Sequence, residues 1–248
     1  MHAIDCKWKT SEIPDLDEYP APAIEWKPSP ACALLSLAAF PPEYAPLLLT
    51  AAERQASIET ALRDWNRRDD VWLFAYGSLI WKADFPVQER RMATVRGYHR
   101  SLCLWSRINR GTLASPGLVF GLNRGGSCRG VALRLAAADV DDVFAALWER
   151  EMMMGSYLPR WLRCDTATGP VEGLAFVIDR GGSGYAGGLA EAEVLAAIRR
   201  AHGRYGACVD YVLDTARALR AHGIRDRRLD QLARRLTAPH EAAPRNPV

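Results

Sequence analysis

A chain of 248 residues, 49% of them hydrophobic, is long enough to bury a substantial core, and its net charge of +3 is too small to indicate a nucleic-acid partner. The N-terminus lacks the apolar segment of a signal peptide, and no apolar stretch is long enough to span a bilayer, so we expect a cytoplasmic protein without a membrane partner. The six cysteines are scattered, with no C-x-x-C pair and no histidines at metal-ligand spacing. This pattern predicts reduced thiols and no metal site.

The N-terminal part is rich in proline at residues 1–48, which excludes long helices there. We expect an irregular arm that packs on the body through its apolar stretch at 31–40. Thr50 and Glu53 match the T-x-x-E capping box and predict a helix that ends near the charged run at 67–70. The sequence therefore predicts an arm with its helix at 1–70, a main domain at 71–236 and a tail at 237–248.

The main domain alternates short strand-like runs with turn residues in its first half. Strands are predicted at 71–77, 92–106, 117–123, 129–135, 157–166 and 171–179. A helix is predicted at 136–153 with Asp139 as its N-cap, and residues 189–236 are predicted to be helical with breaks near 203–206 and 223. Strands first and helices last predict an α+β fold with one mostly antiparallel sheet.

The first candidate for chemistry follows the strand at 71–77. Gly77 lets the chain turn, so that successive backbone N–H groups of residues 76–79 can point one way and bind an anion. The Ser78 hydroxyl can add a further donor. Taken alone the pattern is weak, because any buried strand can end in Tyr-Gly-Ser.

The second candidate is Glu151, in the last turn of the predicted helix at 136–153. It shares a face with the apolar residues Phe144, Leu147 and Trp148, whereas its neighbours Glu149 and Arg150 are predicted to be turned away. A carboxylate that faces a core beside methionines is desolvated, which raises its pKa and suits it to proton transfer near neutral pH. A partly exposed carboxylate at a helix end is the equally weighted alternative.

A G-x-G-x-x-G pattern occurs at Gly182, Gly184 and Gly187. A dinucleotide-binding unit needs a further parallel strand after the helix that follows, and only helix is predicted there. We interpret this pattern as a flexible loop beside the site, with Tyr185 as its one bulky contact residue.

Taken together and in order, the motifs of this chain resemble the ChaC family of γ-glutamylcyclotransferases, which act specifically on glutathione. The resemblance covers roughly residues 71–236. It rests on W-x-F-A-Y-G-S-L-I-W at 72–81, V-R-G-Y-H-R at 95–100, R-G-T with a later P-G at 110–117, G-V-A-x-R-L at 130–135, R-E-M with a later Gly and Tyr at 150–157, Y-A-G at 185–187 and G-x-x-G-x-x-x-D-Y at 203–211.

This resemblance implies a mixed, mostly antiparallel small barrel or sheet flanked by helices, and a reaction without metal or cofactor. Glu151 would move a proton from the substrate's α-amine to the departing amide nitrogen, giving 5-oxoproline and Cys-Gly. The implied substrate-binding residues are Tyr76, Gly77, Ser78, Leu79, Tyr157 and Tyr211. The oxyanion donor would be either the backbone N–H groups of the loop at 76–79 or a tyrosine such as Tyr211. Packing is the alternative role for Tyr157 and Tyr211.

Three other functions stay open at this point. The same fold could act on γ-glutamyl amines or amino acids, and a non-catalytic module could keep the anion-binding loop and use the arm for a protein partner. Nucleotide binding through the glycines at 182–187 would make the loop at 76–79 incidental. We expect a monomer by default.

Overall fold

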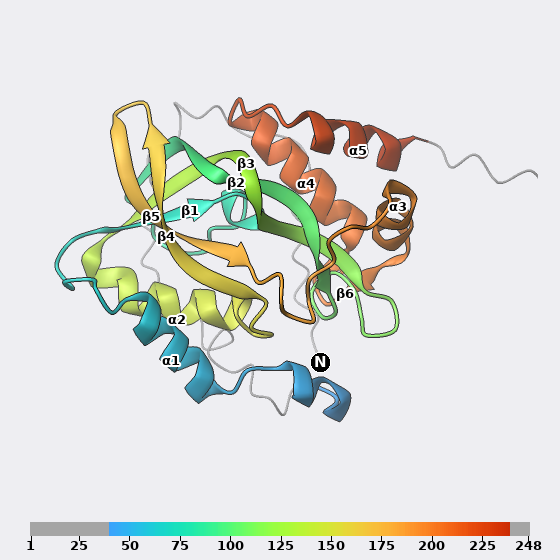
Figure 1. Cartoon of the computed structure of the whole chain (residues 1–248), viewed down its shortest axis with the longest axis horizontal. Helices are drawn as coiled ribbons and strands as arrows, with labels where there is room; N and C mark the ends of the chain where they lie inside the picture. The colour runs from blue at the N-terminus through green and yellow to red at the C-terminus, as the bar shows by residue number, and fades with distance from the viewer. Residues whose placement is uncertain (1–39, 239–248) are drawn as a thin grey trace, which may run out of the picture.

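The computed structural model describes residues 40–238. Within this part of the chain, five strands close into a barrel in the order β1-β3-β2-β4-β5 (Figure 1). The strands are β1 (Val71–Ala75), β2 (Glu89–Ser106), β3 (Gly117–Leu135), β4 (Tyr157–Thr166) and β5 (Gly169–Ile178). β5 is parallel to β1 and β3, and the other pairs are antiparallel. The predicted mixed, mostly antiparallel α+β barrel is therefore confirmed.

The helices lie in two groups outside the barrel. Figure 1 shows α1 and α2 along one side of it, and α3, α4 and α5 along the other. Their bounds are α1 (Ala51–Ala61), α2 (Val140–Glu151), α3 (Glu191–Arg200), α4 (Cys208–Ala221) and α5 (Arg227–Thr237). The short strands β6 (His202–Gly203) and β7 (Gly206–Ala207) form a hairpin between α3 and α4, at the first predicted helix break.

The predicted break between the strands at 117–123 and 129–135 is wrong, and the ends of β1, β2 and β5 differ from the prediction by one to three residues. The sequence predicts separate strands at 117–123 and 129–135, but both belong to the continuous strand β3. Gly125 and Gly126 have φ of +96° and +72°, and the register against β2 shifts between Arg96 and Tyr98. The two glycines thus bend a long strand at a bulge and do not end it.

Helix α2 packs on the barrel through the predicted apolar stripe. Phe144, Leu147 and Trp148 are buried, and the rings of Trp148 and of Phe176 in β5 pack in a T-shaped arrangement with 5.2 Å between centroids. Asp139 precedes the helix as predicted, but its side chain makes no capping hydrogen bond because a 3₁₀ turn, η5 (Ala137–Asp139), leads into α2. Because Glu151, the last residue of α2, shares the face of this stripe, it is turned toward the barrel.

Helix α1 begins at the predicted capping box. The Thr50 hydroxyl accepts a hydrogen bond from Glu53 N at 3.2 Å, and Glu53 Oε2 accepts one from Thr50 N at 2.7 Å. The helix ends at Ala61, earlier than predicted. Most of the predicted arm and most of the tail lie outside the described residues, so the division of the chain at residues 70 and 236 stays a prediction.

Every helix described in residues 40–238 is too short or too polar to span a bilayer.

Candidate active site

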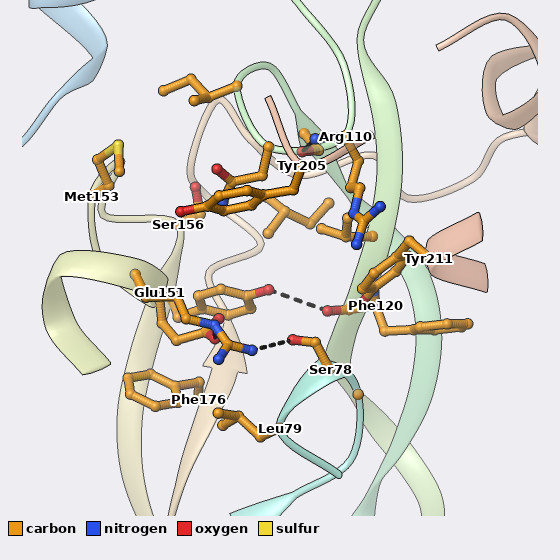
Figure 2. Close-up of a pocket in the computed structure, with 18 of the residues that line it drawn as sticks. Ser78, Leu79, Arg110, Phe120, Glu151, Met153, Ser156, Phe176, Tyr205 and Tyr211 are labelled. Carbon is orange, nitrogen blue, oxygen red and sulfur yellow. Dashed lines mark hydrogen bonds and ion pairs between the residues drawn. The ribbon is translucent and has the colours of Figure 1, made fainter. Parts of the chain in front are cut away.

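A pocket lies between the end of β1, the end of α2, and the strands β2 and β3. All seven predicted site residues line it: Tyr76, Gly77, Ser78, Leu79, Glu151, Tyr157 and Tyr211. Figure 2 shows Glu151 on one side of this space, Ser78 and Tyr211 across from it, and the Tyr205 ring above. The fold thus brings together residues that are more than a hundred positions apart in the chain, although their roles stay a prediction.

The loop after β1 presents backbone donors to this pocket. The chain turns at Gly77 into the 3₁₀ turn η4 (Ser78–Ile80), which is closed by hydrogen bonds from Ile80 N to Gly77 O at 3.0 Å and from Trp81 N to Ser78 O at 3.1 Å. The N–H groups of Gly77, Ser78 and Leu79 donate no hydrogen bond to any residue in the described part. Three adjacent free donors suit a carboxylate.

Glu151 is held out of water. Its side chain is 16% exposed, and its buried Oε1 accepts no hydrogen bond from any residue of 40–238, although Arg150 Nε lies 3.0 Å away. Burial raises the pKa of Glu151, and the nearby Arg150 and Lys82 charges oppose that rise. A buried carboxyl group that has a raised pKa and lies at a pocket can take and return a proton.

The prediction that Arg150 is turned away is wrong. Its guanidinium contacts Glu151 and also donates to Ser78 Oγ at 2.9 Å and to Lys82 O at 2.6 Å. The Cα of Arg150 does lie off the apolar stripe, but the long side chain bends back to the pocket. It therefore ties the end of α2 to the η4 loop.

The three predicted tyrosines differ in how their hydroxyl protons are used. Tyr76 donates to Phe176 O at 2.6 Å and Tyr157 donates to Phe120 O at 3.1 Å, so both protons are engaged. The Tyr211 hydroxyl instead accepts from Phe120 N at 3.0 Å, and it donates to no acceptor within the described residues. Burial raises the pKa of Tyr211, so it stays protonated. Tyr211 therefore keeps a free proton at the pocket.

Several cationic side chains at the pocket were missed by the sequence reasoning. Arg107 and Arg110 line it from the segment after β2, and Lys82 Nζ lies 4.6 Å from the centre of the Tyr205 ring. Arg107 Nη2 donates to Ser183 O at 3.1 Å, while its buried Nη1 has no hydrogen-bond partner among the described residues. Arg110 stands in the R-G-T motif, which was the one available signal.

The Gly-rich segment 181–188 lies against the outer edge of β2. Trp105 N donates to Gly184 O at 2.9 Å, and the Tyr185 hydroxyl accepts from Asn123 Nδ2 at 3.2 Å. Tyr185 does not line the pocket, so the predicted contact at the site is wrong.

Within residues 40–238, no three His, Cys, Asp or Glu side chains lie close enough together to hold a metal ion.

The fold is similar to that of a solved protein, and the sequence is similar to those of curated proteins. A crystal structure of a yeast gamma-glutamyl cyclotransferase specific to glutathione superposes with a TM-score of 0.64 at 18% identity, covering 68% of this chain and 96% of that one. The glutathione-specific gamma-glutamylcyclotransferase of Escherichia coli (strain K12) is 33% identical over 187 residues, which are 75% of this chain and 81% of the relative. The Mus musculus glutathione-specific gamma-glutamylcyclotransferase 1 is 32% identical over 164 residues, covering 63% and 74%.

The barrel therefore has the gamma-glutamyl cyclotransferase fold. The family model described as ChaC-like protein matches residues 71–238. This chain belongs to the ChaC-like family, which confirms the resemblance found in the sequence.

Proposed function

We propose that this protein is a glutathione-specific gamma-glutamylcyclotransferase that converts glutathione to 5-oxoproline and Cys-Gly. Family membership and the names of the relatives support the reaction class. The single observation that carries the site assignment is the buried Glu151 carboxyl, which has a raised pKa and whose Oε1 accepts no hydrogen bond from the described residues, in a pocket lined by the free N–H groups of the η4 loop.

The η4 loop binds the α-carboxylate of the γ-glutamyl group. Free N–H groups of Gly77, Ser78 and Leu79 supply donors without a competing partner in the fold. The Ser78 hydroxyl is already held by Arg150, so its main effect is to fix the loop and the guanidinium relative to each other. This arrangement leaves the neighbouring α-amine near Glu151.

Glu151 then carries protons from the attacking nitrogen to the leaving nitrogen. Its carboxylate removes one proton from the α-ammonium group, and the freed amine attacks the γ-carbonyl carbon to close a five-membered ring. The protonated carboxyl gives that proton to the departing Cys-Gly nitrogen as the carbon–nitrogen bond breaks. The regenerated carboxylate takes the second proton from the ring nitrogen and passes it to the Cys-Gly amine, which leaves as an ammonium ion. Because nucleophile and electrophile belong to one molecule, most of the catalytic task is to hold the bent conformer, and we propose a reaction without cofactor or metal.

The oxyanion formed at the γ-carbonyl needs a donor. Among the three tyrosines only Tyr211 has its proton free within the described structure, and its hydroxyl lies beside the loop, 3.5 Å from where a Cβ on Gly77 would stand. We assign the oxyanion contact to Tyr211. Tyr76 and Tyr157 instead stabilise the pocket wall through their bonds to backbone carbonyls.

The positive side chains around the pocket suit a substrate with a second carboxylate. Glutathione ends in a glycyl carboxylate, distant from the γ-glutamyl end, and the buried Nη1 of Arg107 has no partner in residues 40–238. An Arg–carboxylate contact there would favour glutathione over γ-glutamyl amines, which lack this group. We further propose that the protein is cytoplasmic and monomeric, and that it has no nucleic-acid or membrane partner.

The test is a substrate panel with purified protein, a chelator and no added nucleotide. We expect release of 5-oxoproline and Cys-Gly from glutathione, with kcat/KM at least about tenfold lower for a γ-glutamyl amine without a carboxylate, as expected for a lost charged hydrogen bond. Equal rates for both substrates would favour a general γ-glutamyl cyclotransferase. Tight binding of glutathione without turnover would instead indicate a non-catalytic binding module.

A further inference from the structure

Arg54 is a buried charge that lies outside the family match. Helix α1 precedes residue 71, where the match begins, yet Arg54 is only 8% exposed. Burying a guanidinium is unfavourable unless its donors are satisfied, so the contacts that satisfy them are structurally important.

Those contacts join α1 to the end of α2. Arg54 Nη2 and Nε donate to Glu149 Oε1 at 2.8 and 3.1 Å, and Nη1 donates to Leu49 O. Leu49 N in turn donates to Met153 O at 2.9 Å. Glu149 and Met153 lie two positions before and two positions after Glu151, so one arginine organises anchors on both sides of the carboxylate.

Packing reinforces these hydrogen bonds. Gly155 has φ of +60°, and a Cβ built there would lie 3.2 Å from Leu49 Cδ1, so the Leu49 side chain sits directly on the turn that follows α2. Beside it, Leu48, Ile108 and Met153 form a separate buried cluster, and Ile108 and Met153 also line the pocket. Residues 48–54 thus support the pocket wall from outside.

We propose that Arg54 is a positioning residue that holds the carboxyl of Glu151 in the pocket by fixing the last turn of α2 and the turn after it. The proposal rests on the proposed function. A helix end frays unless its last carbonyls or side chains are held, and here the holding group comes from the N-terminal segment. Without it, Glu151 would turn toward water and lose its orientation toward the α-amine.

The chain offers a matched control at the other end of α2. Arg67 Nη1 pairs with Asp141 Oδ2 at 3.1 Å, again joining the segment before β1 to α2, but these side chains are 64% and 66% exposed. Exposed pairs contribute little, and Asp141 is in the first turn, far along the helix from Glu151. Arg67→Met therefore removes the same charge and the same type of bridge without loosening the site.

The experiment measures kcat, KM and the pH profile of glutathione turnover for the wild type, Arg54→Met, Arg54→Lys and Arg67→Met. We expect Arg54→Met to lower kcat about 10- to 100-fold with KM within about twofold, as for a misplaced catalytic group. The acidic limb of its profile should move to lower pH, because a solvated Glu151 is a stronger acid. Arg54→Lys should recover part of kcat, since lysine can reach Glu149 but lacks the fork that also holds Leu49 O. Arg67→Met should behave as the wild type.

Two outcomes would overturn the proposal: unchanged kcat in folded Arg54→Met, or a loss in which KM rises and the pH profile stays fixed. If Arg54→Met does not fold, the same measurements on Glu149→Gln test the proposal instead. We expect a smaller fall in kcat in this variant, and an unchanged kcat would contradict the proposal. Amide hydrogen exchange at residues 149–153 provides a readout that needs no turnover, and it should quicken in Arg54→Met. An inactive wild type would refute the proposed function, while this exchange would still report whether Arg54 holds the segment.

Discussion

Arg150 and Glu151, adjacent in the sequence, form an ion pair across the end of α2, with 3.0 Å between Arg150 Nε and Glu151 Oε1. Neighbouring helical residues usually point in directions about 100° apart, so this contact requires the arginine side chain to fold back over the helix end. The same guanidinium reaches Ser78, so the charge that tunes the carboxyl also fixes the loop across the pocket.

Arg150→Met should therefore raise the pKa of Glu151 further, because burial would then act with less opposing charge. The base must be ionised to accept a proton, so the acidic limb of kcat/KM should move to higher pH and activity at pH 7 should fall about tenfold or more. A pH–rate profile from pH 5 to 9 checks this. A limb that stays in place would show that Arg150 does not tune Glu151.

Glu151→Gln should make the protein more stable at pH 8 than the wild type. The folded-state pKa of Glu151 is raised above its unfolded value, so the ionised carboxyl weakens the fold above the raised pKa, and this penalty disappears below the unfolded value. Thermal unfolding at several pH values measures it, with about 2–4 °C in Tm for each kcal/mol gained. The difference should shrink as the pH falls, and a wild type that is more stable at pH 8 would contradict the raised pKa.

Tyr211→Phe and Tyr157→Phe should separate catalysis from packing. Each change leaves one backbone group of Phe120 without its partner and should cost about 1–3 kcal/mol of stability. Only Tyr211 has a proton available for the oxyanion, so we expect kcat to fall about 10²- to 10³-fold in Tyr211→Phe and little in Tyr157→Phe. Equal losses of kcat in the two variants would exclude the assignment of Tyr211.

Arg107→Met should weaken binding of glutathione but not of a matched substrate whose glycyl carboxylate is an amide. Loss of a charged hydrogen bond predicts a KM for glutathione about tenfold higher or more, with kcat nearly unchanged. Wild type and variant should have similar KM for the amide. If KM rises equally for both substrates, Arg107 supports the pocket wall and does not bind the carboxylate.

Local patterns predicted much of this molecule because they depend on neighbours in sequence. The capping box at Thr50 marks the start of α1. The apolar stripe of Phe144, Leu147 and Trp148 indicates that Glu151 lies on the inward face of α2. The motif at 72–81 predicted the loop that lines the pocket.

These local patterns could not predict features that depend on contacts between residues far apart in the sequence. Helical periodicity gives the direction of the Arg150 Cα–Cβ bond but not the path of a long side chain toward Ser78 and Glu151. Two adjacent glycines resemble a turn, and only pairing with β2 makes Gly125 and Gly126 a bulge. The burial of Arg54 likewise depends on Glu149, which is 95 positions away.

Turnover of glutathione by the wild type, Glu151→Gln and Asp142→Asn tests the central claim most directly, since Asp142 is an exposed carboxylate on the same helix. We predict that the wild type and Asp142→Asn release 5-oxoproline and Cys-Gly at similar rates, and that Glu151→Gln turns over about 10²- to 10⁴-fold more slowly. Turnover by Glu151→Gln at the wild-type rate would contradict the assignment of Glu151 as the proton carrier.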